Sequence, residues 1–428
     1  MSLNIPTTKV PRVVIIGGGF AGLELANKLD GQNFQVVILD KNNYHQFQPL
    51  LYQVATAGLE PSSIAFPFRK LFQKQDNFHF RMVEVKEIYP EKKRLLTDKG
   101  ELFYDYLVIA SGAGNNFFGN ANIEKYAYPM KSISEALALR NIIFQRFENA
   151  LTSETIKEKD ANLNIVIVGG GPTGVEVAGA LSEMRNKILP KDYPEMDFKT
   201  MRIILIQGDK RLLSSMSEES SSKSDFYLKS MNVEIFYNSK VTNYDGEHVY
   251  FNESESIPTK TLIWAAGIIG NRIAGLETSC YGQGGRILVD QFNACIGHSQ
   301  IFAIGDIALM KADEKFPNGH PQVAQTAIQQ GKRLAKNLTN IQKNEQLVPF
   351  KYKDLGSMAT IGRNKAVVEL TGWKFQGFFA WLVWIVVHLR SILGVKNRFV
   401  VLLNWIWNYF TYNLSLRLII KSNETKND

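Results

Sequence analysis

The 428-residue sequence has few of the features that define disulfide-rich or membrane-spanning proteins. Its only two cysteines, Cys280 and Cys295, form no Cys-x-x-Cys pattern, which excludes a disulfide scaffold. No uninterrupted run of 18 apolar residues occurs, which argues against a protein that crosses the membrane several times. The six histidines are isolated and lack the spacing of metal ligands, so we predict no metal site. Residues 1–11 are polar, so we expect no secretory signal peptide and a chain that stays in the cytosol or on a cytosolic membrane face.

The composition predicts a globular chain of two or three domains. Of its residues, 45% are hydrophobic and 21% are charged, proportions that exclude wholesale disorder. The net charge is +8, and five of these charges come from residues 373–428, which hold seven basic and two acidic residues. The same stretch holds five of the six tryptophans: Trp373, Trp381, Trp384, Trp405 and Trp407. Tryptophan together with basic residues is typical of a membrane interface with anionic lipid.

The apolar run 378–387 in this stretch is too short to cross a bilayer. As a helix its ten residues extend about 15 Å, against a hydrocarbon core of about 30 Å. We therefore predict helices over about residues 373–420 that lie in one leaflet, with His388 as an interfacial residue. The alternative is that these apolar faces pack into a core or a dimer interface.

Two segments of the sequence are near copies of each other. Residues 13–24 read VVIIGGGFAGLE and residues 165–176 read IVIVGGGPTGVE. Each is an apolar run, a glycine turn and a helix opening, which is the pattern of a dinucleotide-binding βαβ unit. We therefore predict an α/β fold with two Rossmann-like dinucleotide-binding domains plus a C-terminal amphipathic membrane-anchoring region. The predicted boundaries are 1–120 and 290–345 for the first domain, 121–289 for the second and 346–428 for the C-terminal region.

Further apolar runs predict short parallel strands that feed ligand crevices. They are Val36–Leu39, Tyr106–Ile109, Ile203–Ile206, Thr261–Trp264 and Ile301–Ile304. The serine-rich stretch Ser214–Asp225 predicts a solvated loop or the start of a helix.

The first glycine motif is Gly17-x-Gly19-x-x-Gly22. Its glycines permit a tight turn and a close approach of the backbone to a pyrophosphate at a helix N-terminus. Asp40 ends the next strand, 23 residues after Gly17, where a carboxylate accepts hydrogen bonds from ribose hydroxyls. A further strand ends in Gly305-Asp306, and an acid there is placed to accept from the hydroxyls of a polyol such as ribityl.

The second motif is Gly169-x-Gly171-x-x-Gly174, but the acid expected after its next strand is missing. That strand ends in the neutral Gln207, and Asp209 follows two residues later. A carboxylate at the strand end accepts from the ribose 2′-hydroxyl and repels a 2′-phosphate. One interpretation is relaxed selection between NADH and NADPH; the other is that Asp209 does the same work from a shifted turn.

Glu176 follows the second motif on the first turns of its helix. There a carboxylate gains from the helix dipole, which is a sufficient structural reason for it. The position is also near the expected nicotinamide, so a hydrogen bond to the ring or its amide is the second interpretation.

The order and spacing of these motifs resemble the flavoproteins that carry two dinucleotide-binding domains, over nearly the whole chain. Narrower segments resemble one branch, the type II NADH dehydrogenases (NADH:quinone oxidoreductases). They are Asn43–Ala55, Trp264–Gly267, Ala324–Gly331, Trp381–His388, Asn397–Arg398 and Trp405–Trp407. Gln207 departs from the family, whose NADH-specific members have an acid there, and Ile328 stands where some members have a histidine.

The resemblance implies that the first domain holds FAD and the second holds NAD(P)H, with Glu176 and Gln325 as the catalytic residues. The implied FAD contacts are Gly17, Gly19, Phe20, Ala21, Gly22, Asp40, Lys41, Pro49, Val85, Ala110, Ser111, Gly112, Gly305, Asp306, Ala324 and Gln325. The implied NAD(P)H contacts are Gly169, Gly171, Pro172, Thr173, Gly174, Glu176, Gln207, Ala266 and Gly267. The implied quinone contacts are Ala324, Gln325, Ile328 and Gln329.

The same resemblance predicts the reaction and its setting. A hydride passes from NAD(P)H to FAD, and a membrane quinone is then reduced by two electrons without proton pumping. We expect a peripheral or monotopic protein on the cytoplasmic face of the cell membrane. It should bind an anionic membrane surface and form a homodimer, with no nucleic acid partner.

Other functional classes remain as alternatives. One is a soluble NAD(P)H-dependent flavoprotein that reduces another acceptor and uses its tail as a dimer interface. A second is a sulfide:quinone oxidoreductase-like enzyme, but such enzymes need sulfur-carrying cysteines, and Cys280 and Cys295 are more simply interpreted as buried thiols. A third is a non-catalytic flavoprotein that binds nucleic acid, which the mixing of basic residues with tryptophans argues against.

Overall fold

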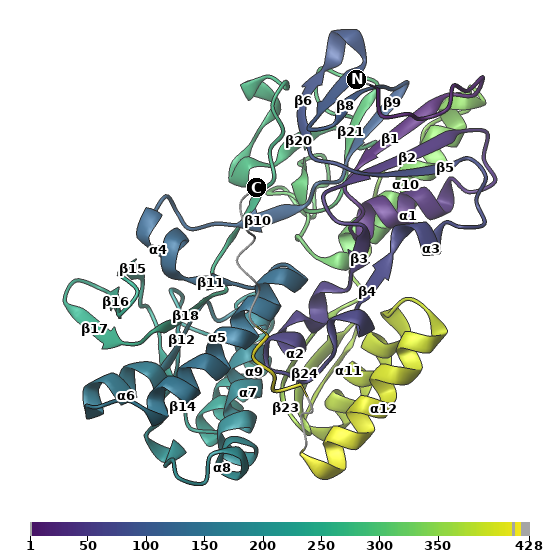
Figure 1. Ribbon diagram of the computed structural model, residues 1–428. Helices are drawn as coiled ribbons and strands as arrows, with labels where there is room; N and C mark the ends of the chain where they lie inside the picture. Colours follow the sequence, from purple (N-terminus) through teal and green to yellow (C-terminus); the bar gives the residue numbers. More distant parts are fainter. Residues whose placement is uncertain (1, 413–415, 421–428) are drawn as a thin grey trace. The chain divides into compact units, whose positions relative to one another are not determined.

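The computed structural model describes residues 2–412 and 416–420 (Figure 1). Contacts divide the chain into two compact units, each with its own parallel sheet. The first unit comprises Met1–Gln46, Ala65–Gly114 and Ile268–Asp354, and the second comprises Phe47–Ile64, Asn115–Gly267 and Leu355–Asp428. The sequence places residues 47–64 in the first nucleotide domain and gives residues 346–428 a region of their own, whereas residues 47–64 and 355–428 share their contacts with the second unit.

A five-stranded parallel sheet forms the centre of the first unit, in the order β21-β9-β1-β2-β5. These strands are β1 (Arg12–Ile16), β2 (Gln35–Asp40), β5 (Phe78–Met82), β9 (Tyr106–Ile109) and β21 (Ile301–Ala303). Alternate β1 side chains face opposite sides of the sheet. Val14 joins an apolar cluster with Leu95 and Leu102 of the antiparallel sheet β6-β7-β8 (Val85–Tyr89, Arg94–Thr97, Gly100–Phe103).

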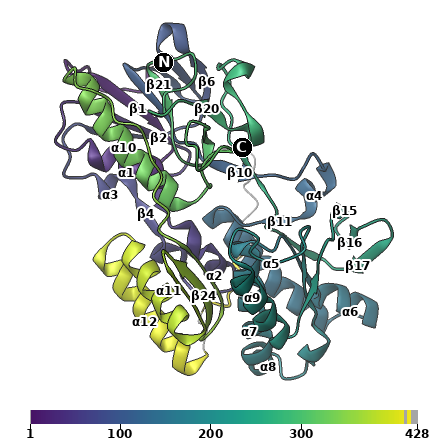
Figure 2. The same ribbon diagram turned by 180° about the vertical axis from the view of Figure 1, so that it is seen from behind.

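Two helices cover the other face of this sheet. They are α1 (Phe20–Lys28) and α10 (Ala324–Gln342), which lie side by side (Figure 2). The contact is close because Gly331 of α10 has no side chain: a Cβ there would lie 2.7 Å from the carbonyl oxygen of Ala21 in α1. The helix that begins at the first glycine turn is thus held by α10.

The second unit repeats this arrangement around its own parallel sheet, in the order β11-β18-β12-β13-β14. Its strands are β11 (Tyr128–Pro129), β12 (Ile165–Val168), β13 (Ile203–Ile206), β14 (Val233–Phe236) and β18 (Thr261–Trp264). Val166 and Ile204 pack against Phe251 in the antiparallel meander β15-β16-β17 (Val241–Tyr244, His248–Phe251, Glu255–Pro258). The helix α7 (Pro172–Lys187) covers the opposite face.

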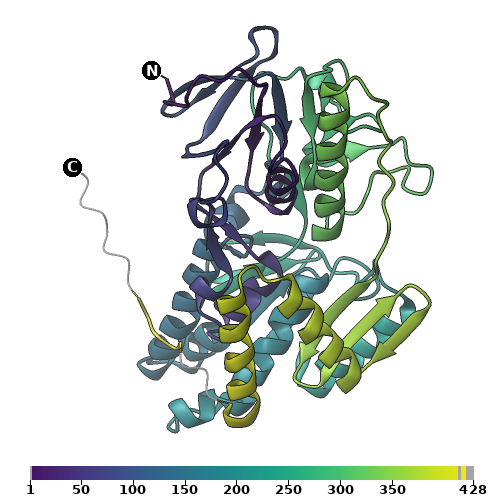
Figure 3. The same cartoon turned by 90° about the vertical axis from the view of Figure 1, so that its right-hand side faces the viewer.

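The C-terminal part of the second unit is a small antiparallel sheet followed by two helices (Figure 3). These elements are β23 (Ser357–Gly362), β24 (Lys365–Leu370), β25 (Trp373–Gln376), α11 (Phe378–Ser391) and α12 (Val395–Thr411). Ala366 and Val368 of β24 form a buried cluster with Ala380 of α11. The strand β23 lies against α7, since a Cβ on Gly179 of α7 would lie 1.7 Å from the carbonyl oxygen of Ile361.

Further helices and strands complete the described residues. The helices are α2 (Leu51–Ala55), α3 (Phe68–Leu71), α4 (Ala121–Tyr126), α5 (Ile133–Leu151), α6 (Ile156–Leu163), α8 (Leu189–Asp192) and α9 (Glu218–Ser230). The strands are β3 (Tyr44–Gln46), β4 (Ala65–Pro67), β10 (Ala113–Asn115), β19 (Ile268–Gly270), β20 (Ile287–Val289) and β22 (Ala308–Met310). Among the described residues, no helix is both long and apolar enough to cross a membrane.

The strands and the two glycine-turn helices expected from the sequence are confirmed, with differences of a few residues at their ends. The serine-rich stretch is the start of a helix and not a solvated loop. Ser217 caps α9 by accepting from the backbone N–H of Ser220, and Ser221 and Ser224 are buried.

Candidate functional site

The three motif glycines of the first unit are required for three different reasons. Gly17 has a φ of +100°, and a Cβ there would lie 2.4 Å from the carbonyl oxygen of Ala110. A Cβ on Gly22 would lie 2.0 Å from the carbonyl oxygen of Gly17. A Cβ on Gly19, in contrast, would meet no atom of the protein within 4 Å. The open position is the one at which a pyrophosphate approaches the backbone at the start of α1, so the turn fits a dinucleotide.

Asp40, at the end of β2, fixes the glycine turn. Its Oδ2 accepts from the backbone N–H of Gly18 at 2.7 Å, and its Oδ1 accepts from Asn42 at 2.8 Å. Burial raises the pKa of Asp40 above its usual value, and these two hydrogen bonds oppose the rise. The neighbouring Lys41 is paired with Glu84 at 2.7 Å on the surface.

The predicted polyol-binding turn is held by α10 in the same unit. Gly305 has a φ of +76°, and its N–H donates to Oε1 of Gln330 at 2.7 Å. The backbone oxygen of Asp306 accepts from Nε2 of Gln322 at 2.8 Å. Sequence reasoning missed Gln330, which is 1% exposed; a polar residue on the buried face of α10 was the signal that could have found it.

The glycine turn of the second unit has nearly the same geometry as the turn of the first unit. Gly169 has a φ of +107°, and a Cβ there would lie 2.6 Å from the carbonyl oxygen of Ala265. A Cβ on Gly174 would lie 1.9 Å from the carbonyl oxygen of Gly169, whereas one on Gly171 would meet nothing within 4 Å. Pro172 occupies the first position of α7, which its missing N–H allows.

Gln207 takes the place of Asp40 in this second turn. Its Oε1 accepts from the N–H of Gly170 at 2.8 Å, as Asp40 accepts from Gly18. Its Nε2 donates to Oδ2 of Asp209 and to the carbonyl oxygen of Arg211, both at 3.2 Å. The buried amide of Gln207 is therefore engaged within the protein, and the exposed Asp209 supplies a carboxylate beside the turn.

The other predicted contacts lie at the ends of strands or at the start of helices. In the first unit, Ala110, Ser111 and Gly112 follow β9, Phe20 and Ala21 begin α1, and Val85 begins β6. In the second unit, Thr173 is exposed on the first turn of α7, and Ala266 and Gly267 follow β18. Pro49, a predicted FAD contact, lies in the short helix Gln48–Leu50 of the same unit. The first-turn positions and the strand ends meet at the carboxyl edge of each sheet, where ligands of such folds bind.

Three of the four predicted quinone contacts, Ala324, Gln325 and Ile328, lie on the first turns of α10 and are partly exposed. Gln329 has a structural role instead of an open amide. Its Nε2 donates to the carbonyl oxygen of Lys353 at 2.8 Å, and its Oε1 accepts from the N–H of Lys353 at 3.0 Å.

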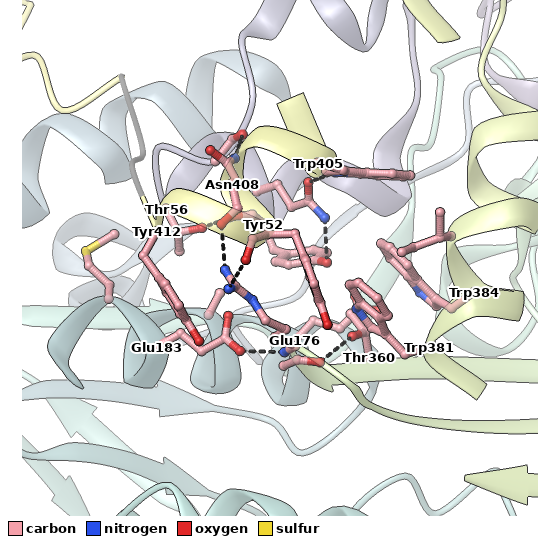
Figure 4. A pocket seen from close by; sticks show the side chains of 18 of the residues that line it. Tyr52, Thr56, Glu176, Glu183, Thr360, Trp381, Trp384, Trp405, Asn408 and Tyr412 are labelled. Carbon is pink, nitrogen blue, oxygen red and sulfur yellow. Dashed lines mark hydrogen bonds between the residues drawn. The ribbon is translucent and has the colours of Figure 1, made fainter. Parts of the chain in front are cut away.

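Glu176 faces a partly open cavity of about 150 Å³ in the second unit (Figure 4). The cavity is lined by α2, α7, β23, α11 and α12, and it contains a second carboxylate, Glu183. Burial raises the pKa of Glu176 to about 8, although a hydrogen bond from the backbone of Thr360 opposes the rise. At neutral pH this side chain is therefore a protonated acid, and such an acid can donate a proton.

Aromatic residues form most of the cavity wall, and three of them are tail tryptophans expected at the membrane interface. Trp381, Trp384 and Trp405 all line the cavity, and Trp384 is 2% exposed. Trp373 and Trp407, in contrast, are 73% and 60% exposed. Burial contradicts the interfacial interpretation for Trp384, because α11 packs this side chain against the body of the second unit, whereas for the partly exposed Trp381 and Trp405 the interpretation stays a prediction.

His388, also expected at the interface, is partly exposed and packs against two aromatic rings. Its ring stacks on Trp384 with centroids 4.1 Å apart and meets the edge of Phe47. Burial lowers the pKa of His388 to about 4, so the ring is neutral at pH 7.

The two cysteines are buried free thiols of the first unit. Burial raises the pKa of both Cys280 and Cys295, which keeps them as thiols and makes them poor nucleophiles. They do not have the properties of sulfur-carrying residues. Within the described part of the chain, no group of three or more His, Cys, Asp or Glu residues is arranged to hold a metal ion.

Comparisons with known proteins identify relatives over nearly the whole chain. Residues 11–331 match the family model of pyridine nucleotide-disulphide oxidoreductases, and residues 355–411 match the NDH2 C-terminal domain. The type II NADH:quinone oxidoreductase Ndh of Mycobacterium tuberculosis is 34% identical over 94% of this chain and 89% of its own length. The type II NADH:quinone oxidoreductase of Staphylococcus haemolyticus is 30% identical over 90% of this chain and 96% of its own length. The structure of NDH2 from Plasmodium falciparum in complex with NADH has a similar fold, with a TM-score of 0.88 at 23% identity over 96% of this chain and all of the other.

Proposed function

This chain belongs to the type II NADH:quinone oxidoreductase family, and we propose that it catalyses the oxidation of NADH by a membrane quinone without pumping protons. The observation that carries this proposal is the duplicated glycine turn. In each of the two glycine motifs, the second motif glycine leaves open space where a side chain would lie: Gly19 in the first unit and Gly171 in the second. Two dinucleotides can therefore bind, one as a resident cofactor and one as a substrate.

FAD is the proposed cofactor of the first unit. Gly19 leaves room for its pyrophosphate, Asp40 stands at the end of β2 near the ribose position, and Gly305-Asp306 offers an acid to the ribityl chain. When bound, FAD supplies the redox chemistry, taking a hydride from NADH and giving two electrons to the quinone. The protein's part is to hold the rings in place and to exclude water.

NADH is the proposed electron donor, with NADPH as a poorer one. Asp209 is exposed and its carboxylate is oriented by Gln207, so it can accept from the 2′-hydroxyl of NADH. Lys210 and Arg211 follow directly, and their positive charges reduce the repulsion of a 2′-phosphate. We therefore expect measurable oxidation of NADPH alongside NADH.

Gln325 of the first unit and Glu176 of the second unit are the proposed catalytic residues. The Gln325 amide is a hydrogen-bonding partner for a quinone carbonyl, and Ala324 and Ile328 supply apolar surface on the same turns of α10. Glu176 is the general acid, since its carboxyl is protonated at neutral pH and opens on an apolar cavity.

The proposed membrane contact is the outer face of α11 and α12. We also propose that the protein lies on the cytoplasmic face of the membrane and forms a homodimer. Large apolar side chains are exposed along both helices. They are Phe378, Phe379, Leu382, Val386, Val387, Val395, Phe399, Leu403, Ile406, Trp407 and Phe410. A continuous row of exposed apolar side chains on two helices that are too short to cross a membrane fits a protein that lies in one leaflet. Of the basic residues counted in the tail, Lys421 and Lys426 lie outside the described residues.

The function is tested anaerobically with the purified full-length protein. NADH should bleach the flavin absorbance, and menadione added afterwards should restore it. Gln325→Ala should slow only the second step, with Lys336→Ala, an exposed residue farther along α10, as the control. A flavin that menadione does not reoxidise would remove the central claim, and equal losses in both steps would place Gln325 elsewhere.

A separate experiment tests the membrane contact on intact α11 and α12. The double substitution Phe399→Ser and Phe410→Ser alters two side chains that are 61% and 76% exposed, so the fold should persist. The variant should bind anionic phospholipid vesicles at least about tenfold more weakly. Unchanged vesicle binding would show that this face is not the contact.

A further inference from the structure

Gly18, the middle residue of the first glycine turn, is held at both of its backbone polar groups. Its N–H donates to Oδ2 of Asp40 at 2.7 Å, and its carbonyl oxygen lies 2.9 Å from Nδ1 of His45. A Cβ on Gly18 would lie 2.0 Å from the ring of Phe68, so this ring packs directly on the glycine. Gly18 is buried, whereas the next residue, Gly19, is exposed. The protein therefore fixes the inner residue of the turn and leaves the outer one accessible.

The middle residue of the second turn, Gly170, is held in the same way by different groups. Its N–H donates to Gln207, and its carbonyl oxygen accepts from the backbone N–H of Leu213 at 2.8 Å. A Cβ on Gly170 would lie 2.6 Å from the side chain of Leu212. A backbone N–H thus makes in the second unit the contact that the His45 side chain makes in the first. Since unrelated residues supply the same contact twice, the turn itself requires a donor at this carbonyl.

His45 of β3 is suited to this contact because its ring is buried and neutral. The side chain is 1% exposed, and burial lowers its pKa to about 4, although the hydrogen bond to Gly18 opposes the fall. At pH 7 the ring therefore carries a single N–H. A carbonyl oxygen can only accept, so this N–H is on Nδ1. The ring also packs at 81° against that of Phe20, the first residue of α1, with centroids 5.1 Å apart.

The contact at Gly18 sets the direction of the next N–H. The carbonyl of Gly18 and the N–H of Gly19 belong to one peptide group, and no peptide bond among the described residues is cis. In a trans peptide the C=O and the N–H point in opposite directions, so a carbonyl drawn toward His45 turns the Gly19 N–H away from it. Gly19 is the N-cap of α1, where N–H groups lack partners within the helix and attract a phosphate.

We propose that His45 is a positioning residue for FAD, which holds the Gly18 carbonyl and thereby aims the Gly19 N–H at the pyrophosphate. The inference rests on the proposed function, in which FAD occupies the first unit. His45 acts through the peptide between the two glycines and not by touching the cofactor. Such a contact is needed because Gly17, Gly18 and Gly19 are consecutive glycines, and glycine loses more conformational freedom on ordering than any other residue. A turn ordered in advance binds FAD without that loss, which favours a cofactor that stays through many turnovers.

The first test follows the release of FAD from the full-length holoenzyme after dilution, by the rise in the fluorescence of free flavin. His45→Ala should release FAD at least about tenfold faster than wild type, because the buried carbonyl of Gly18 loses its donor. Imidazole added to His45→Ala should slow the release again, since it can fill the vacated space and donate an N–H. The control is His298→Ala, a partly exposed histidine that precedes β21 in the same unit, which should match wild type.

A second test separates the hydrogen bond from packing. In His45→Asn the side-chain Nδ2 is attached to Cγ, as Nδ1 is in histidine, so a donor to Gly18 remains although the ring is lost. In His45→Phe a ring remains against Phe20, but it has no donor. If the hydrogen bond positions the peptide, the asparagine variant should release FAD more slowly than the phenylalanine variant. A role in packing alone predicts the opposite order. If His45→Ala does not fold, this order still decides the question.

The affinity for NAD⁺, measured by calorimetry at saturating FAD, provides a readout in the other unit. The carbonyl of Gly170 is held by Leu213 and not by a histidine, so the Kd for NAD⁺ should be unchanged in every His45 variant. A loss of NAD⁺ affinity as large as the loss of FAD affinity would show a general disruption of the chain and would overturn the assignment.

The outcomes distinguish this inference from the proposed function. If wild type carries FAD and His45→Ala releases it at the wild-type rate, His45 does not position the cofactor and the function stands. Faster release from the asparagine variant than from the phenylalanine variant, or no response to imidazole, would also overturn the inference. If wild type carries no FAD at all, the proposed cofactor itself is wrong.

Discussion

The two glycine turns of this protein are nearly identical, yet the glutamate that follows each has a different environment. Glu24 and Glu176 both lie two residues after the third glycine of their motif. Glu24 lies beside Lys332 of α10, with 3.8 Å between Nζ and Oε1, and both side chains are partly exposed. Glu176 faces a partly open, mostly apolar cavity, and desolvation raises its pKa to about 8.

The difference comes from the element that packs against each helix. In the first unit Gly331 brings α10 against α1, and α10 carries a lysine toward Glu24. In the second unit Gly179 brings the edge of β23 against α7, and a strand edge offers backbone N–H groups but no positive charge. The same motif therefore produces a surface ion pair in one place and a neutral acid in the other.

The largest effect should come from adding a methyl group at the third glycine of either turn. Gly22→Ala and Gly174→Ala both place a Cβ about 2 Å from a backbone oxygen of their own turn. Each should destabilise its unit by about 3 kcal/mol, measured by denaturant unfolding, since the backbone cannot move away cheaply. Gly171→Ala is the matched control, because its Cβ meets no protein atom; it should leave stability unchanged and weaken NADH binding.

The second prediction concerns the strand ends at which the turns differ. Asp209→Asn removes the carboxylate that repels a 2′-phosphate, so kcat/KM for NADPH relative to NADH should rise roughly tenfold at low ionic strength. Gln207→Glu should instead lower kcat/KM for NADPH more than for NADH, because it puts a second carboxylate beside Asp209. An unchanged ratio in Asp209→Asn would mean that Asp209 does not select the donor.

The third prediction is a pH dependence of stability that belongs to Glu176. In the folded protein Glu176 stays protonated up to about pH 8, whereas in the unfolded chain it ionises near pH 4.5. The unfolded state therefore binds fewer protons between these values, and the free energy of unfolding falls as the pH rises through that window. Glu176→Gln should flatten this fall, which unfolding midpoints measured from pH 5 to pH 8 would reveal. Parallel curves for wild type and variant would contradict the raised pKa.

The smallest effect should come from the corresponding change in the first unit. Glu24→Gln removes a long, partly exposed ion pair with Lys332, and such pairs contribute about 0.5 kcal/mol or less. Its unfolding midpoint should shift little and by the same amount at each pH from 5 to 8. A large shift would mean that the two glutamates are more alike than their surroundings indicate.

Much of the fold was accessible from the sequence because its signals are local. The apolar runs at β2, β9, β13, β18 and β21, together with the two motif strands, predicted most of both parallel sheets, whereas β5, β11 and β14 were not identified. Gln207 was identified as a departure, but its contacts with Gly170 and Asp209 required the folded turn. The tail tryptophans could not be sorted into buried and exposed, because that depends on which side of α11 and α12 packs against the second unit.

The sequence by itself determined the two strand–turn–helix modules, because their requirements are local. Gly17 and Gly169 have a positive φ, and the third glycine of each motif lies against the first, only five residues earlier. Only the tertiary structure decided the protonation state of Glu176. Its protonation depends on the burial created by β23, α2 and α11, elements that lie more than a hundred residues away along the chain. Desolvation arises from all groups that surround a carboxyl, and a motif specifies only the few that are close in sequence.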